Sequence, residues 1–290
     1  MTMAATLSEP FLPGVSPDVY GPADFRAVAD LVYSVSGNVL AEGKAMLVYS
    51  RLAPLVRETN TSTFANFVEL IRSDADVQAR TVAALTTNHT FFYRESHHFE
   101  HFEKVDRPEI VRRLNIGQPV RIWSAGCSSG EETWSLVLTL LGIDRLEGRR
   151  IANRDLRVLA SDIAPHALRK AQAGIYAAKD IAAMPSDLVQ LWTQAEGDTV
   201  SIGEVARSIV RFRSLNLMGD WPITGQFDVI FCRNVMIYFD GPTKERLIAR
   251  FANALAPGGH LYIGHSERVT GPATALLEPA GPTIYRRRNA

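Results

Sequence analysis

The chain has 290 residues, which is enough for one large domain or for two ordinary domains that each bury a core. Apolar residues make up 46% and charged residues 21% of the composition, which excludes a wholly disordered or fibrous protein. Lys plus Arg and Asp plus Glu each count 31, so the chain lacks the broad basic field of a general nucleic-acid binder.

The cysteines and the apolar runs indicate the compartment. Cys127 and Cys232 lie in apolar surroundings without metal-ligand spacing, which predicts buried thiols in a reducing environment. No apolar run approaches the roughly 20 residues that span a bilayer, and the N-terminus lacks the pattern of a signal peptide. We therefore expect a cytoplasmic protein without membrane insertion.

The first part of the chain predicts a tail followed by helices. Residues 1–22 are rich in proline, glycine and small residues, which predicts a flexible tail. Residues 23–86 show apolar side chains at helical spacing, as at Phe64, Phe67, Val68 and Ile71, and are predicted to form a helical domain. Residues 87–118 are also helix-like, are crowded with aromatic and histidine residues, and are interpreted as a linker.

From residue 119 to residue 290, short apolar runs alternate with helical segments. Strands are predicted at residues 120–125, 156–160, 227–232 and 261–263, and a helix at 164–176. Strands separated by helices pair in parallel through right-handed crossovers, so we predict an α/β fold with a doubly wound, mostly parallel sheet. Ligands bind at the carboxyl ends of the strands in such sheets.

One segment departs from this alternation. Short runs at residues 199–202 and 208–212, with breaks at Gly197 and Gly203, predict a small antiparallel β insertion over about residues 188–213.

The first predicted strand leads into a turn that contains Gly126 and Gly130 and then Glu131 and Glu132. Glycines let the backbone approach a ligand closely, whereas the P-loop and dinucleotide fingerprints are both absent. Carboxylates attract a cation and repel phosphate, so the turn favours a nucleoside with a cationic tail, as in S-adenosylmethionine. The structural alternative is a capping box, with Ser129 as the N-cap and Glu132 as its partner.

The next strands end in further polar side chains. Asp162 could accept two hydrogen bonds from a ribose diol, or it could cap the helix that follows. Arg233 and Asn234 follow the third strand, where a core strand needs no polar groups. We expect these side chains to face the same ligand.

Five blocks of the sequence, in the same order, resemble the chemotaxis receptor glutamate methyltransferases of the CheR family over about residues 24–288. The blocks are NHTFFYRESHHF at 88–99, IWSAGCSSGEE at 122–132, ASDI at 160–163, FDVIFCRNVMIYF at 227–239 and GHSE at 264–267. The resemblance implies a helical N-terminal domain and a class I S-adenosylmethionine methyltransferase domain that carries a small antiparallel subdomain. It also implies that the product is a glutamyl methyl ester on the cytoplasmic domain of a methyl-accepting chemoreceptor.

The resemblance further implies nine cofactor contacts, of which the strand-end argument independently selects four. The nine residues are Asn88, Thr90, Arg94, Glu132, Asp162, Asn216, Leu217, Arg233 and Asn234. Arg94 and Tyr238 are implied to lie nearest the transferred methyl group, as the catalytic pair. The implied cofactor is S-adenosylmethionine, with S-adenosylhomocysteine as its product and with no metal.

The chemistry itself demands few groups. A glutamate carboxylate has an ordinary pKa of about 4.3, so it is ionised at neutral pH and needs no general base. Holding the reacting atoms in line can supply roughly 7 to 11 kcal/mol. Arg94 is predicted to orient the carboxylate and Tyr238 to shape the methyl channel. The competing interpretation of Arg94 is a surface ion pair with Glu95 or Glu100.

Other functions remain as alternatives. His97, Glu100 and His101 match the H-x-x-E-H pattern of a zinc hydrolase, although a third ligand is not evident. A non-catalytic scaffold that binds S-adenosylmethionine would keep the same site residues. A nucleic-acid substrate is not expected. Nucleic-acid methyltransferases usually carry an Asn/Asp-Pro-Pro-aromatic motif or a Pro-Cys nucleophile, and the strand that ends at Cys232 is followed by neither.

Recognition of the receptor is less well defined. The family is associated with a basic helix in the N-terminal domain, but residues 1–85 contain six Lys or Arg against nine Asp or Glu. Pro54 lies within the corresponding segment, residues 51–58, where a helix accepts proline only at its start or at a bend. The compact insertion predicts that the protein does not depend on a peptide tether at the C-terminus of the receptor. We also expect a monomer.

Overall fold

The computed structural model describes Leu12, residues 15–16 and residues 18–289. These residues form two compact units, and the chain passes from one to the other between Thr87 and Asn88. Each unit has a hydrophobic core of its own. No helix in the described part of the chain is both long enough and apolar enough to cross a membrane.

The N-terminal unit is helical. Its apolar faces enclose a core that includes Val28, Leu52 and Phe67, each with no exposed surface. Thr63 and Asp74 cap their helices by accepting hydrogen bonds from backbone N–H groups. The helices are α1 (Pro22–Ser36), α2 (Ala45–Glu58), α3 (Phe64–Ser73) and α4 (Ala75–Leu85), with a short 3₁₀ turn, η1 (Glu42–Lys44).

The predicted flexible tail is wrong over its described part. Tyr20 is fully buried, packs on Phe64 at 4.4 Å between ring centroids, and donates its hydroxyl to the Ala45 carbonyl. Leu12 is buried in the same core, and Pro22 already begins α1. Apolar side chains among the prolines and glycines therefore anchor this segment. Residues 1–11, 13–14 and 17 lie outside the described residues.

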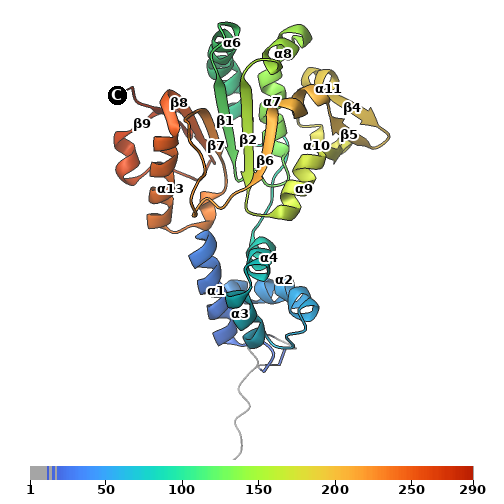
Figure 1. Ribbon diagram of the computed structural model, residues 1–290, viewed down its shortest axis with the longest axis vertical. Coiled ribbons are helices and arrows are strands. Elements are labelled where there is room, and N and C mark those ends of the chain that lie inside the picture. The colour runs from blue at the N-terminus through green and yellow to red at the C-terminus, as the bar shows by residue number, and fades with distance from the viewer. Residues whose placement is uncertain (1–11, 13–14, 17, 290) are drawn as a thin grey trace, which may run out of the picture. The chain divides into compact units, whose positions relative to one another are not determined.

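The larger unit contains a seven-stranded sheet in the order β6-β2-β1-β7-β8-β10-β9 (Figure 1). The strands from β6 to β8 are parallel, and β10 runs antiparallel to both of its neighbours. This arrangement confirms the predicted doubly wound, mostly parallel α/β fold. The strands are β1 (Val120–Ala125), β2 (Leu156–Asp162), β6 (Val210–Ser214), β7 (Phe227–Cys232), β8 (Leu255–Ile263), β9 (Leu277–Gly281) and β10 (Ile284–Arg287).

Helices cover both faces of this sheet because alternate strand residues point to opposite sides. Ile122 and Phe231 face a core shared with α7, whereas Trp123 and Cys232 face a core shared with α13. The helices of this unit are α5 (Ser96–His101), α6 (Arg107–Asn115), α7 (Glu131–Leu141), α8 (Arg145–Ala152), α9 (Pro165–Ala173), α10 (Ala178–Ile181), α11 (Ser186–Trp192), α12 (Glu204–Ile209) and α13 (Gly241–Ala254). A π-helix, η2 (Phe102–Asp106), joins α5 to α6, and two 3₁₀ turns are η3 (Met236–Tyr238) and η4 (Gly271–Ala275).

A second, three-stranded antiparallel sheet has the order β3-β5-β4 and consists of β3 (Ile175–Ala177), β4 (Thr193–Glu196) and β5 (Thr199–Ile202). The predicted insertion at 188–213 is wrong in part, because residues 210–214 form β6, which pairs in parallel with β2 in the main sheet. The predicted helix at 164–176 ends at Ala173, since Gly174 adopts a left-handed conformation and leads into β3. Helix is also absent from residues 88–95, where Tyr93 and Glu95 have positive φ values.

Candidate functional site

The carboxyl ends of β1, β2, β7 and β8 lie at one edge of the sheet, because these four strands are parallel. We call this the carboxyl edge. The segments that follow the four strands meet there with residues 88–95, which precede α5. Four residues of those segments were expected from the sequence to face one ligand: Glu132, Asp162, Arg233 and Asn234.

The turn after β1 is held close to its neighbours. The N–H groups of Gly126 and Cys127 both donate to the Ser161 carbonyl, at 2.8 and 2.9 Å, which fixes the tip of β1 to that of β2. Gly126 has φ +77°, and a Cβ atom there would lie 2.4 Å from Cγ2 of Val235. Only glycine satisfies both the conformation and this close approach.

The capping-box interpretation of the same turn is wrong. The N-cap of α7 is Gly130, in the left-handed region at φ 95°, and no side chain caps the helix. The Ser129 hydroxyl donates to the Glu131 carboxylate instead. Glu132 points toward β1, where its Oε1 accepts a hydrogen bond from the Ser124 hydroxyl at 2.8 Å. The left-handed glycine starts the helix one residue later than predicted, and this frees Glu132 for the carboxyl edge.

Asp162 receives backbone N–H groups on both oxygens. Its Oδ2 accepts from Ser128 at 2.7 Å and its Oδ1 from Ala164 at 2.9 Å. Burial raises the pKa of this carboxyl, and the backbone hydrogen bonds oppose that rise. The N-cap of α9 is Ala164, so Asp162 braces the preceding turn and is not the helix cap. The Ile163 N–H also hydrogen-bonds this carboxylate, and of its roughly four lone pairs one is left for a ligand donor.

Residues 215–217 lie beside Asp162, because the N–H of Leu215 donates to the Asp162 carbonyl at 3.0 Å. The Asn216 side chain accepts a hydrogen bond from the Met218 N–H, which holds the turn. Leu217 is buried, and its carbonyl accepts from Arg250 of α13. The structure thus brings this family-implied pair to the tip of β2.

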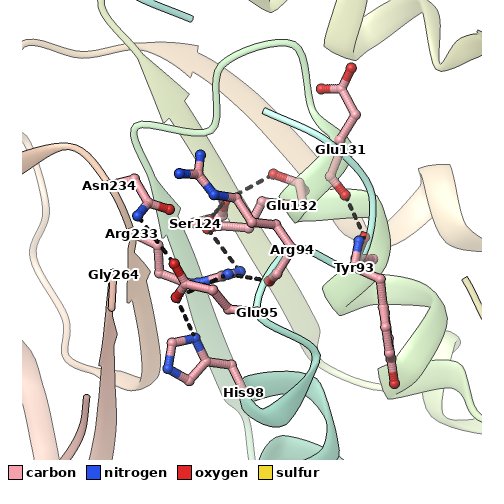
Figure 2. Close-up of polar contacts among 12 residues, drawn as sticks. Tyr93, Arg94, Glu95, His98, Ser124, Glu131, Glu132, Arg233, Asn234 and Gly264 are labelled. Atoms are coloured by element: carbon pink, nitrogen blue, oxygen red, sulfur yellow. Dashed lines mark hydrogen bonds and ion pairs between the residues drawn. The ribbon is translucent and has the colours of Figure 1, made fainter. Parts of the chain in front are cut away.

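Arg233 lies at the centre of a buried ionic cluster (Figure 2). Its guanidinium is 3.4 Å from Oε2 of Glu95 and 3.6 Å from Oε2 of Glu132, with only 1% of the side chain exposed. It also donates to the Arg94 carbonyl and lies over the Phe99 ring. The two carboxylates face Arg233 directly, and the charge of Arg94 also acts on Glu132. Such a cluster favours a cationic ligand.

The two carboxylates of the cluster have different pKa directions. Burial raises the pKa of Glu132, and the charge of Arg233 and the hydrogen bond from Ser124 only partly oppose it. Burial would also raise the pKa of Glu95, but Arg233 and hydrogen bonds from His265 and Asn234 lower it to about 2. Glu95 is therefore a fixed anion at neutral pH.

Sequence reasoning missed Glu95 as a site residue. Its Oε1 accepts from Asn234 Nδ2 at 3.2 Å and from the His265 N–H at 3.3 Å, and it lies 2.9 Å from Nδ1 of His265. Glu95 thus joins residues 88–95 to the tips of β7 and β8. Its only signal in the sequence was its position directly after Arg94, because its partners lie 139 and 170 residues away.

The two predicted catalytic residues come from different segments. Arg94 donates to the His89 carbonyl at 3.1 Å and lies over the Phe91 ring at 5.5 Å from its centroid. The alternative ion pair with Glu95 is not formed, because Glu95 faces Arg233 and His265. Tyr238 ends η3, is half-buried and packs against the core shared with α13.

The remaining predicted residues lie in the segment before Arg94. The Asn88 carbonyl accepts from the Ser128 hydroxyl at 3.0 Å, and its side-chain amide lies 3.0 Å from Nε2 of His166. Thr90 is half-buried. Asn88 therefore ties this segment to the turn after β1.

Of the two histidines in the zinc-like pattern, His101 has another partner, whereas Nε2 of His97 is buried without a hydrogen-bond partner among the described residues. His101 Nδ1 lies 2.7 Å from the Tyr262 hydroxyl, which itself donates to Asp106. His98 is fully buried, and burial with the charges of Arg233 and His97 lowers its pKa to about 3. Within the described residues, no group of three or more His, Cys, Asp or Glu side chains could hold a metal ion. Cys127 and Cys232 are buried free thiols, as expected, and burial raises the pKa of both.

Comparisons with known proteins show what the two units are similar to. The family profile described as "CheR methyltransferase, SAM binding domain" matches residues 88–283, and that described as "CheR methyltransferase, all-alpha domain" matches residues 23–86. A Rhizobium etli protein named "Probable chemotaxis protein methyltransferase" is 42% identical over 262 residues, covering 88% of this chain and 96% of that protein. "Chemotaxis protein methyltransferase 2" of Pseudomonas aeruginosa is 38% identical, and the match covers 92% of this chain and 93% of that protein. "Chemotaxis protein methyltransferase" of Escherichia coli is 36% identical, covering 84% of each chain.

Proposed function

The chain belongs to the CheR methyltransferase family, and from this premise we propose that it transfers a methyl group from S-adenosylmethionine to glutamate carboxylates of chemoreceptor cytoplasmic domains. The products are glutamyl methyl esters and S-adenosylhomocysteine. The relatives named above are chemotaxis methyltransferases, which supports a receptor as the protein substrate.

The observation that carries the proposal is the buried cluster of Glu95, Glu132 and Arg233, with the negative charge of its carboxylates beside the glycine turn. S-adenosylmethionine has a sulfonium and an ammonium group, which such a charge attracts. Asp162 lies at the tip of β2 and retains a lone pair that can accept a hydrogen bond from a ribose hydroxyl. The donor set therefore fits this cofactor.

We propose that the other family-implied residues complete the cofactor site. Asn216 and Leu217, beside Asp162, would contact the nucleoside. Asn88, Thr90 and Arg94 would cover it from residues 88–95, and Asn234 would do so from the tip of β7. Glu132 and Arg233 would hold the charged tail.

The bound cofactor supplies an electrophilic methyl group, and the protein has to orient the acceptor and exclude water. The acceptor glutamate is already ionised, so no side chain has to remove a proton. Arg94 is our proposed orienting group, because its guanidinium donates to the His89 carbonyl and forms no direct ion pair with a carboxylate of the described residues, although its charge acts on Glu132. Tyr238 is proposed to shape the channel for the methyl group.

The test combines binding and transfer. Calorimetric titration with S-adenosylhomocysteine should show saturable one-site binding, and radiolabelled S-adenosylmethionine with receptor cytoplasmic fragments should give base-labile, volatile methanol. Asp162→Ala should lose most of the binding, whereas Asp155→Ala, an exposed aspartate at the opposite end of β2, should keep it. Binding without any methanol release would instead favour the non-catalytic scaffold.

We further propose that the protein acts in the cytoplasm as a monomer and does not depend on a receptor tether. The small sheet supports the last point: its edge strands, β3 and β4, have only three and four residues, so the sheet offers short edges to an added strand. Methylation of receptors that lack their C-terminal peptide should equal that of intact receptors. Tight binding of the isolated tail peptide would contradict this expectation.

A further inference from the structure

A cavity of about 220 Å³ opens beside the segment that links Arg233 and Asn234 to Tyr238. Its walls come from three elements: η3 provides Met236 and Ile237, α13 provides Lys244 and Ile248, and the loop after β8 provides Arg268. Nothing in the proposed cofactor contacts uses these five side chains.

The cavity combines apolar walls with unpaired cations. Met236 and Ile248 are each 1% exposed, whereas Ile237 leaves 43% of its surface in water. Lys244 and Arg268 form no ion pair with any described carboxylate. An apolar wall with two free cations complements a side chain that has methylene groups and a terminal carboxylate.

The neighbouring groups keep the two cations available. The Arg268 guanidinium donates to the carbonyls of His265 and Glu267, at 2.8 and 2.6 Å, which fixes it without neutralising it. The Glu267 carboxylate also lines the cavity, but it accepts the N–H groups of Gly264 and Asn234. Its Oε2 is therefore held by the backbone at the tips of β7 and β8, whereas its Oε1 is buried without a hydrogen-bond partner among the described residues.

The position of the cavity indicates its occupant. The proposed cofactor residues Asp162 and Asn216 lie toward β2 and β6, on one side of β1. β7 and β8 lie on the other side, so an acceptor that approaches the methyl group in line comes over their tips. Met236 and Ile237 lie between Asn234 and Tyr238 in the chain, so the cavity adjoins this approach.

We propose that the cavity binds a second acidic side chain of the receptor segment, adjacent to the glutamate that is methylated. The methylene groups would lie on Ile237 and Ile248, and the carboxylate would face Lys244 and Arg268. Residues three or four apart on a helix project from the same face, about 5 to 6 Å apart, so one receptor helix could fill both sites. The inference rests on the proposed function and adds to it a sequence requirement in the substrate.

The test exchanges charges across the proposed contact. Lys244→Glu should raise the KM for a receptor cytoplasmic fragment by about 3- to 10-fold, the range expected for one charge contact at a partly buried interface. The affinity for S-adenosylhomocysteine should stay within about two-fold of wild type, because Lys244 is not a cofactor residue. Lys244→Arg should keep a nearly normal KM. Arg154→Glu, with the same charge change on an exposed residue before β2, is the matched control.

The receptor carries the complementary variants. Acidic residues three or four positions from each methylated glutamate are changed to lysine one at a time, and one change should restore the KM of Lys244→Glu while raising that of wild type. The proposal is overturned if Lys244→Glu and Arg268→Glu both leave the receptor KM unchanged in an active enzyme, or if no receptor variant rescues them. Absence of methylation by wild type would refute the proposed function itself.

Discussion

Arg233 is the residue whose replacement tests the ionic cluster most directly. The pKa of Glu95 is held at about 2 against an ordinary value of 4.5. At about 1.4 kcal/mol per pKa unit, this difference stabilises the folded protein by about 3 kcal/mol when Glu95 is ionised. Arg233 is the largest contributor to that lowering, and it also faces Glu132. Arg233→Met should therefore lower the free energy of unfolding by about 3 to 5 kcal/mol at neutral pH, the usual loss when a buried ion pair loses one partner.

The pH dependence has a definite sign. In wild type, the contribution of Glu95 is fully present above about pH 4.5 and is lost as the pH falls toward 2, because the folded-state pKa is the lower one. In Arg233→Met the pKa values of Glu95 and Glu132 rise, so the folded variant takes up protons that the unfolded chain does not bind. The difference in the free energy of unfolding between variant and wild type should therefore shrink as the pH is lowered from about 7 to about 5.

Urea unfolding followed by tryptophan fluorescence measures this difference, since all four tryptophans lie in the larger unit. Arg213→Met, an exposed arginine at the end of β6, is the matched control and should change stability by less than about 0.5 kcal/mol. Adding Glu95→Gln to Arg233→Met should recover part of the loss, because one buried charge is then removed. A loss below about 1 kcal/mol at pH 7, or one that does not vary with pH, would refute the reasoning.

Three further variants test the carboxyl edge. Gly126→Ala places a Cβ 2.4 Å from Val235 Cγ2 at φ +77°, and should cost about 1 to 3 kcal/mol and weaken S-adenosylhomocysteine binding in a titration. Gly117→Ala, at φ +81° with nothing within 4 Å, should show the backbone cost of about 1 to 2 kcal/mol alone, with normal binding. Asp162→Asn should reduce that affinity about 10-fold or more, since one acceptor oxygen becomes a donor. Arg94→Ala should lower kcat for methyl transfer much more than S-adenosylhomocysteine affinity, and equal losses in both would argue against an orienting role.

The sequence predicted the central strands best. Residues 120–125 and 227–232 form β1 and β7 with the predicted bounds, because both are short apolar runs buried on two faces. Only residues 261–263 of β8 were predicted, since the preceding Pro257, Gly258 and Gly259 are typical of a turn. In the structure these residues belong to β8, whose pairing with β7 shifts register between Phe227 and Val229.

The predictions from sequence failed where contacts between distant parts of the chain override a local pattern. The alternation of Val210 and Phe212 with Arg211 and Arg213 fits any half-buried strand, and only the parallel pairing with β2 assigns it to the main sheet. Tyr20 was predicted to lie in a tail because its neighbours are proline and glycine. Its burial depends on packing against Phe64, 44 residues later in the sequence, which no local composition reveals.

At the site, too, the sequence predicted which residues are involved but not which partners they contact. The polar residues after each strand could be identified because parallel strands end at one edge, but their pairing depends on how residues 88–95 cross that edge. Arg233 faces Glu95, and not solvent, because Glu95 has a left-handed conformation at φ 57° that begins α5. The same carboxylate holds Asn234 and His265, so one side chain fixes the tips of both β7 and β8.

Arg94, the proposed orienting group, directly precedes Glu95 in the chain. The contacts of Glu95 with the tips of β7 and β8, where the receptor is proposed to approach, therefore also position Arg94. Cofactor binding and receptor binding should therefore be coupled through Glu95, and Glu95→Gln should weaken both, whereas Lys244→Glu should weaken only the second.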